Sequence, residues 1–182
     1  GDTWARIELS EGEFHTVTLA KSEEQTFGPA TGDFDNDGDL DFAISYIDEE
    51  VLNYEIRIFI NDGQGNFTNQ TIYEMFMASD ITDLETGDFD NDGDIDILVS
   101  YSETDSMPPE GYWYKDFSVV IMLKNEGNLQ FSPTNELIRR GNVTQGYVPP
   151  NHRINMYIAG GDYDLDGDLD LVTGDNSGIV EY

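Results

Sequence analysis

Apolar residues along the chain gather in short runs that are separated by glycine, asparagine and aspartate. β-Branched and aromatic residues predominate within these runs, which is typical of β-strands. No segment repeats apolar residues at i, i+3, i+4 and i+7, the pattern of an amphipathic helix. The sequence therefore predicts an all-β fold, with strands over Phe42 to Ile47, Tyr54 to Ile60, Ile97 to Tyr101, Phe117 to Leu123 and Leu171 to Thr173.

An internal repeat leads into three of these strands. Residues 32–41, 87–96 and 161–170 align without gaps in the pattern Gly-Asp-aromatic-Asp-x-Asp-Gly-Asp-apolar-Asp. We call the nine residues after the first glycine the first loop (33–41), the second loop (88–96) and the third loop (162–170). Aspartate then occupies positions 1, 3, 5, 7 and 9 of each loop, and glycine occupies position 6.

A second signature follows the first two loops at a distance. The segments Asn61 to Phe67 and Asn125 to Phe131 each begin Asn-acidic-Gly, which predicts hairpin turns between strands. The second repeat is longer than the first, and its additional residues fall in two connections, Ser102 to Asp116 and Leu137 to Gly160. The first connection contains two prolines and a glycine and predicts a long loop between two strands.

The spacing of these motifs organises the chain as a single array of repeats. Repeats of this size with three or four strands each are typical of β-propeller blades. We divide the chain into the tail of a preceding blade (1–31), a first repeat (32–86), a second repeat (87–160) and a partial third repeat (161–182). Because both ends then fall within a repeat, we expect the chain to belong to a longer propeller or to associate through its open ends.

The aspartate loops predict three calcium ions. Calcium takes six to eight oxygen ligands, and alternate residues of a tight loop can turn their side chains onto one centre. Positions 1, 3, 5 and 9 supply carboxylates, position 7 can offer its backbone carbonyl, and the glycine at position 6 permits a sharp turn. The predicted metal residues are Asp33, Asp35, Asp37, Asp39 and Asp41 in the first loop, Asp88, Asp90, Asp92, Asp94 and Asp96 in the second, and Asp162, Asp164, Asp166, Asp168 and Asp170 in the third.

Other interpretations of the loops fit less well. Asp-Gly also favours solvated Asx-turns, but five aspartates within nine residues repel one another strongly unless a cation is present. Magnesium demands stricter geometry than calcium, and zinc would require histidine or cysteine, whereas His15 and His152 are isolated. An EF-hand would need glutamate at position 12, where this chain has Ile44, Val99 and Thr173. Position 9 must therefore close the site.

The charge of the chain limits its partners. The formal net charge is −30, from 38 acidic and 8 basic residues. Such a field repels phosphate backbones and anionic lipid headgroups, so we expect no nucleic-acid partner and no direct membrane insertion. There is no cysteine, and bound ions could stiffen the fold in place of disulfides. A hydrophobic content of 38% is nevertheless enough to build a core.

The motifs match a known family. The pattern Asp-x-Asp-x-Asp-Gly-x-x-Asp before a strand, followed by Asn-x-Gly-x-Gly-x-Phe, resembles the FG-GAP and VCBS repeats of integrin alpha-subunit-like β-propellers. Phe27, Gly28, Pro29 and Ala30 resemble the Phe-Gly element that precedes the loop in that family. The resemblance implies a propeller of about seven blades, and this chain would be a partial or open form of it. It also implies extracellular or cell-surface placement and a role in adhesion or in glycan-associated proteins.

The predicted function is that of a calcium-stabilised extracellular module for binding, adhesion or structure. Its predicted partners are a protein or glycan ligand, or further blades or subunits that contact its open ends. We predict no catalytic residues. Two alternatives stay open: a non-catalytic part of a polysaccharide-degrading enzyme, and a filament or surface-layer subunit. Two further features could carry function, namely an aromatic run at Tyr112, Trp113 and Tyr114 and glycosylation acceptor patterns at Asn66, Asn69 and Asn142.

Overall fold

The structure is a computed structural model that describes residues 3–8, 14–20, 24–48, 53–76, 81–107, 113–145, 155–175 and 180–181. All regular structure in these residues is β, as the sequence predicts. The strands are β1 (Thr3–Glu8), β2 (Phe14–Ala20), β3 (Glu24–Gly32), β4 (Asp41–Asp48), β5 (Asn53–Asn61), β6 (Phe67–Phe76), β7 (Ile81–Gly87), β8 (Asp96–Met107), β9 (Trp113–Asn125), β10 (Phe131–Pro133), β11 (Ile138–Gln145), β12 (Met156–Gly161), β13 (Asp170–Asp175) and β14 (Val180–Glu181).

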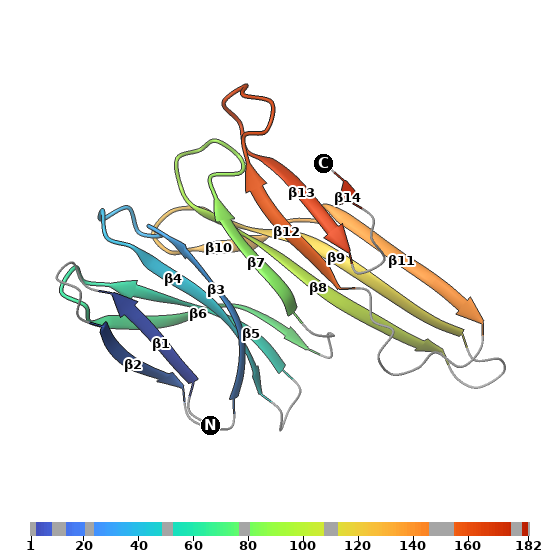
Figure 1. The fold of residues 1–182 in the computed structure, drawn as a ribbon, viewed down its shortest axis with the longest axis horizontal. Coiled ribbons are helices and arrows are strands. Elements are labelled where there is room, and N and C mark those ends of the chain that lie inside the picture. Colours follow the sequence, from blue (N-terminus) through green and yellow to red (C-terminus); the bar gives the residue numbers. More distant parts are fainter. Residues whose placement is uncertain are drawn as a thin grey trace.

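The strands form a hairpin and three antiparallel sheets that follow one another along the chain (Figure 1). The first sheet has the order β3-β4-β5-β6, and the hairpin β1–β2 precedes it. The second sheet has the order β7-β8-β9-β10, with β11 also paired to β9. The third has the order β12-β13-β14. These sheets are open, and their succession is that of an open, propeller-like β fold.

The sheets are held together by apolar residues that alternate between the two faces of each sheet. In β8, Ile97 and Val99 join the core between the first and second sheets, whereas Leu98 faces the third sheet. Successive residues of a strand point to opposite faces, so a sheet between two others must be apolar on both. Leu98 accordingly packs with Met156 and Ile158 of β12. The second sheet is therefore the centre of the stack.

The innermost strands of the three sheets, β3, β7 and β12, lie side by side. Their contacts are partly polar, since the Thr86 hydroxyl donates to the Thr31 carbonyl at 2.6 Å. Asp83 accepts the backbone N–H of Ile158 at 3.0 Å. This parallel placement brings the three loops, which follow these strands, to the same edge of the stack (Figure 1).

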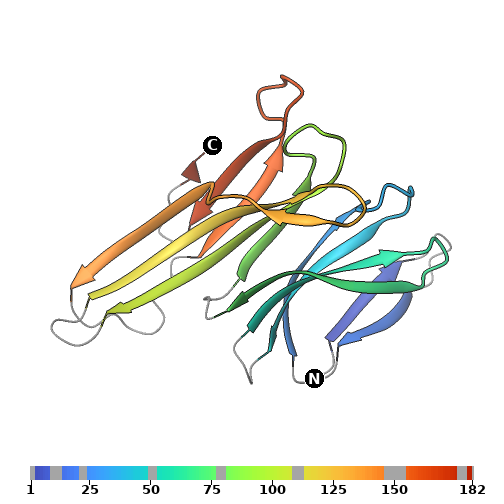
Figure 2. The ribbon, with the colours of Figure 1, turned by 180° about the vertical axis from the view of Figure 1, so that it is seen from behind.

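The predicted strands and hairpin turns are confirmed, with two corrections in the second repeat. The expected connection from Leu137 to Gly160 contains β11, which pairs with β9, and most of β12. The predicted long loop over Ser102 to Asp116 is wrong, because β8 continues to Met107 and β9 begins at Trp113, with these two residues paired across the ladder. Polar residues fill this part of β8, so hydrophobic runs alone do not reveal it. Figure 2 shows the resulting long strands β8, β9 and β11 from behind.

The sheets are also offset from the sequence repeats by one strand. β3 lies largely before residue 32 yet pairs with β4, and its ladder is interrupted by an irregularity between Phe27 and Ala30. β7 and β12 likewise precede the second and third loops and pair with the strands after them. Each loop is thus the connection between the first two strands of one sheet.

Candidate metal centres

Each loop connects an inner strand to the central strand beside it and is organised by its first aspartate. The two carboxylate oxygens of Asp33 accept the backbone N–H groups of Asp37 at 3.1 Å and Gly38 at 3.0 Å. The same pair of bonds occurs in the other loops, from Asp92 and Gly93 to Asp88 and from Asp166 and Gly167 to Asp162. The position-5 aspartates in turn accept the N–H of position 7 at 2.9–3.0 Å.

The backbone of each loop turns at two residues with positive φ. The position-6 glycines have φ of 95°, 96° and 101°, values that L side chains rarely adopt, so the sharp turn predicted there is confirmed. Position 4 is left-handed as well, with φ of 60° at Asn36, 59° at Asn91 and 64° at Leu165. Asparagine tolerates this conformation better than leucine does.

The position-9 aspartates close the loops from the base. One oxygen of Asp41 accepts the Phe34 N–H at 2.9 Å, and the other accepts the N–H of Asn61, the first residue of the β5–β6 turn, at 2.8 Å. Asp96 makes the equivalent bonds to Phe89 and Asn125 at 3.1 and 2.9 Å. The aspartate loop and the hairpin turn of one sheet are therefore tied together through a buried carboxylate.

Burial perturbs these two carboxyl groups. Asp96 is fully buried, and desolvation raises its pKa to about 6 despite the two backbone bonds that favour the charged form. Desolvation also raises the pKa of Asp41 above its ordinary value. Both effects disfavour the ionised carboxylate.

Carboxylate oxygens converge within each loop. In the first loop one oxygen from each of Asp33, Asp35 and Asp37 lies within 4.8 Å of the others. In the other two loops the third member is the position-9 aspartate instead of the position-5 one, so the groups are Asp88, Asp90 and Asp96 in the second loop and Asp162, Asp164 and Asp170 in the third. Oxygens that share one calcium ion at 2.3–2.6 Å can be separated by about 5 Å at most, so these donor sets fit such an ion. The groups contain neither histidine nor cysteine, and they do not fit zinc.

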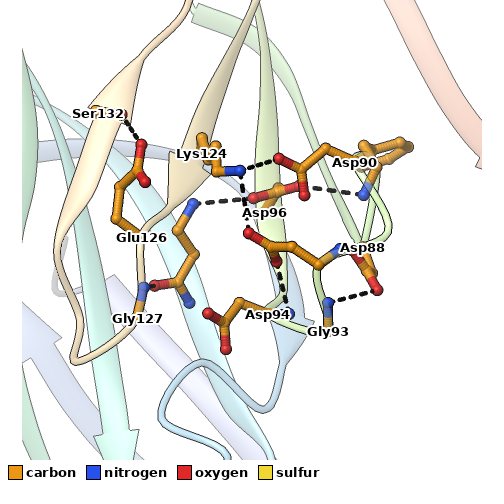
Figure 3. Close-up of polar contacts among 12 residues, drawn as sticks. Asp88, Asp90, Gly93, Asp94, Asp96, Lys124, Glu126, Gly127 and Ser132 are labelled. Carbon is orange, nitrogen blue, oxygen red and sulfur yellow. Dashed lines mark hydrogen bonds and ion pairs between the residues drawn. The ribbon is translucent and has the colours of Figure 1, made fainter.

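The second loop already holds a positive charge. The Lys124 ammonium contacts the Asp90 carboxylate and lies 3.0 Å from a carboxylate oxygen of Asp92 (Figure 3). Its bonds to these two carboxylates raise the pKa of Lys124 above its ordinary value. A side-chain cation thus lies at carboxylates predicted to bind a metal ion. Sequence reasoning missed Lys124, although a basic residue next to the Asn125 turn is conspicuous in so acidic a chain.

The position-7 aspartates link neighbouring loops through their side chains. Asn36 of the first loop donates its side-chain N–H to Asp94 of the second at 2.6 Å. Asn91 of the second loop donates to Asp168 of the third at 2.6 Å. These carboxylates are directed toward the adjacent loop, whereas the sequence interpretation used only the backbone carbonyl of position 7. The asparagine at position 4 of two loops was the available signal for this link, but its partner lies in another repeat.

We predict that Asn36→Gly lowers the free energy of unfolding by about 0.5–1 kcal/mol, because it removes the bond to Asp94 while keeping a residue that accepts positive φ. Asn36→Ala should cost about 1 kcal/mol more, since alanine is strained at this φ. Urea denaturation of both variants in calcium-containing buffer measures the difference. Equal stability of the wild type and the glycine variant would show that the link between loops contributes nothing.

Several sequence candidates lie elsewhere. His15, His152, the aromatic run at residues 112–114 and the acceptor Asn142 fall outside the residues whose side chains the structure describes. Asn66 and Asn69 are exposed on the β5–β6 hairpin, and the side chain of Asn66 donates to Asp62 at 2.8 Å. Glycosylation at these positions stays a prediction, as do the metal ligands themselves.

Comparison with known proteins identifies one segment of the chain. The family model of the FG-GAP-like repeat matches residues 46–99, which extend from β4 through the second loop into β8. No curated protein and no solved structure matches the chain. The described residues contain no helix long and apolar enough to cross a membrane. Residues 46–99 are thus an FG-GAP-like repeat, and the first and third loops carry the same aspartate pattern as the loop within it.

Proposed function

We propose that each of the three loops binds one calcium ion and that the chain is a calcium-stabilised repeat module. The observation that carries the proposal is the convergence of three carboxylates within 4.8 Å in every loop, on the same set of backbone hydrogen bonds. Five aspartates in nine residues supply more negative charge than a solvated turn needs. Oxygen donors of this kind suit calcium, which accepts irregular coordination more readily than magnesium does.

An ion in such a loop would stabilise the sheet around it. The loop joins the end of the inner strand to the start of the central strand, and in the first two loops the position-9 carboxylate also holds the hairpin turn of the same sheet. Three structural elements therefore meet at one centre. In a chain without cysteine, this cross-link takes the place that a disulfide has in many secreted domains.

We further propose an extracellular or cell-surface setting in which the module binds a protein or glycan, or further repeat units. The FG-GAP-like repeat supports this setting, because such repeats usually occur in extracellular proteins and are generally non-catalytic. Calcium sites of extracellular modules work with dissociation constants of about 10⁻⁴–10⁻³ M. Sites in this range would be filled outside cells and empty in the cytosol.

Calorimetric titration tests the calcium proposal. Chelator-treated protein should bind three calcium ions per chain, and Asp35→Asn or Asp164→Asn should each lower the number to two, because each removes one carboxylate from a converging group. The matched control is Glu74→Gln, which removes an exposed acidic residue of β6 outside the loops and should leave three ions bound. A titration without binding heat and without any calcium-dependent spectral change would refute the proposal.

A further inference from the structure

We propose that Lys124 is a built-in counter-cation of the second loop, so that calcium must displace its ammonium group and binds the second loop more weakly than the first. This inference rests on the proposed function, and it assigns to a residue outside the aspartate motif a role in setting the affinity of one site. Figure 3 shows Lys124 on β9 with its ammonium group directed at Asp90.

The position of Lys124 is fixed by its neighbour in the chain. Asn125 is fully buried, its N–H donates to Asp96 at 2.9 Å, and its side chain donates to the Phe34 carbonyl at 3.0 Å. The backbone at Asn125 is therefore held both by the second loop, through Asp96, and by the first loop, through Phe34. A long basic side chain that starts one residue earlier is held within reach of the loop carboxylates.

The position-3 aspartate has a different partner in the second loop from its partner in the other two. In the first loop the position-3 carboxylate of Asp35 accepts the N–H of Asp37 at 3.2 Å. In the third loop Asp164 accepts the N–H of Asp166 at 3.2 Å. Asp90, at position 3 of the second loop, contacts Lys124 instead, and the Asp92 N–H donates to Asp88. The carboxylate that differs between the loops is the one that faces the lysine.

The first loop has no equivalent of this lysine at the matching position. Asn61 occupies the place of Asn125, since its N–H donates to Asp41 as that of Asn125 donates to Asp96. The residue before Asn61 is Ile60, which carries no charge. The first and second loops thus share their aspartates, glycine and turn anchor but differ in one nearby side chain.

The expected consequence is electrostatic. The ammonium group and a calcium ion compete for Asp90 and Asp92, and if both stay near the loop they repel each other. Repulsion between a unit charge and a double charge about 5 Å apart in water corresponds to a factor of about ten in a dissociation constant. Without calcium, the same lysine neutralises part of the loop and keeps its carboxylates together.

The two loops can be followed separately in the intact chain. The amide groups of Gly38 and Gly93 each donate to the position-1 aspartate of their own loop, so their NMR signals report calcium binding at that loop. In a calcium titration of the wild type, Gly38 should respond at about tenfold lower free calcium than Gly93. Lys124→Met, which keeps the aliphatic chain and removes the charge, should lower the midpoint of Gly93 about tenfold and leave that of Gly38 unchanged.

The reciprocal variant guards against an indirect effect of Lys124→Met on folding. Ile60→Lys places the charge at the matching position of the first loop, where Ile60 is half-buried against the core, and should raise the midpoint of Gly38 toward that of Gly93. Equal midpoints in the wild type that do not move in either variant would overturn the role of Lys124 while leaving the calcium proposal intact. Glycine signals that do not respond to calcium at all would instead overturn the proposed function on which it rests.

Discussion

Chelation of calcium should lower the melting temperature of this chain more than any single surface substitution. A ligand that binds only the native state stabilises it by RT ln(1 + [L]/Kd), about 2.7 kcal/mol per site at a free concentration of 100 Kd, or about 8 kcal/mol for three independent sites. For a chain of this size, each kcal/mol shifts the melting temperature by about 2–4 °C, so the expected loss is about 15–30 °C. Thermal unfolding followed by circular dichroism, in calcium and in excess EGTA, measures it.

Two controls make this prediction specific. Magnesium at the same concentration should restore little of the stability if the loops prefer calcium. Asp35→Asn should reduce the calcium-dependent part of the stabilisation by about one third or more, since one of three sites is lost and the first loop is expected to bind calcium more tightly than the second. Identical melting curves with calcium and with chelator would show that the loops do not depend on an ion for their structure.

The local part of this architecture could be predicted from the sequence. The loop geometry is encoded within nine residues, because the position-6 glycine permits positive φ and the position-1 carboxylate reaches N–H groups four and five residues later. The strands after the loops could also be predicted, because the apolar pattern that identifies each strand lies within the strand itself. β3 was not predicted, since it contains Gly28 and Pro29 and is a strand through its pairing with β4.

The contacts that distinguish the loops from one another could not be predicted in this way. Lys124 meets Asp90 across 34 residues of sequence, and Asn36 meets Asp94 across 58. The first pair depends on the pairing of β9 with β8 inside the second sheet, and the second pair depends on how the first sheet is placed against the second. The apolar periodicity of the sequence contains neither piece of information. The extension of β8 to Met107 has a similar origin, because its partner β9 supplies the ladder hydrogen bonds.

Because of the stacking of the sheets, the side chain at position 2 of the loop contributes differently to stability in different repeats. Position 2 is aromatic in every loop, but Phe34 is buried in the core between the first and second sheets, where its ring meets Phe131 edge-on at 6.1 Å. Tyr163, at the same position of the third loop, is 54% exposed. An identical substitution at these two positions therefore separates the contribution of packing between sheets from that of the loop itself.

Phe34→Ala should lower the free energy of unfolding by about 3–5 kcal/mol, since it removes a buried aromatic ring and leaves a cavity that the rigid sheets fill only partly. Tyr163→Ala should cost less than about 1 kcal/mol, because half of its side chain already contacts water. Urea denaturation in saturating calcium measures both variants with the loops equally occupied. Similar losses in the two variants would mean that position 2 acts through the conformation of the loop, and that the packing of Phe34 against the second sheet contributes little to the stability of the chain.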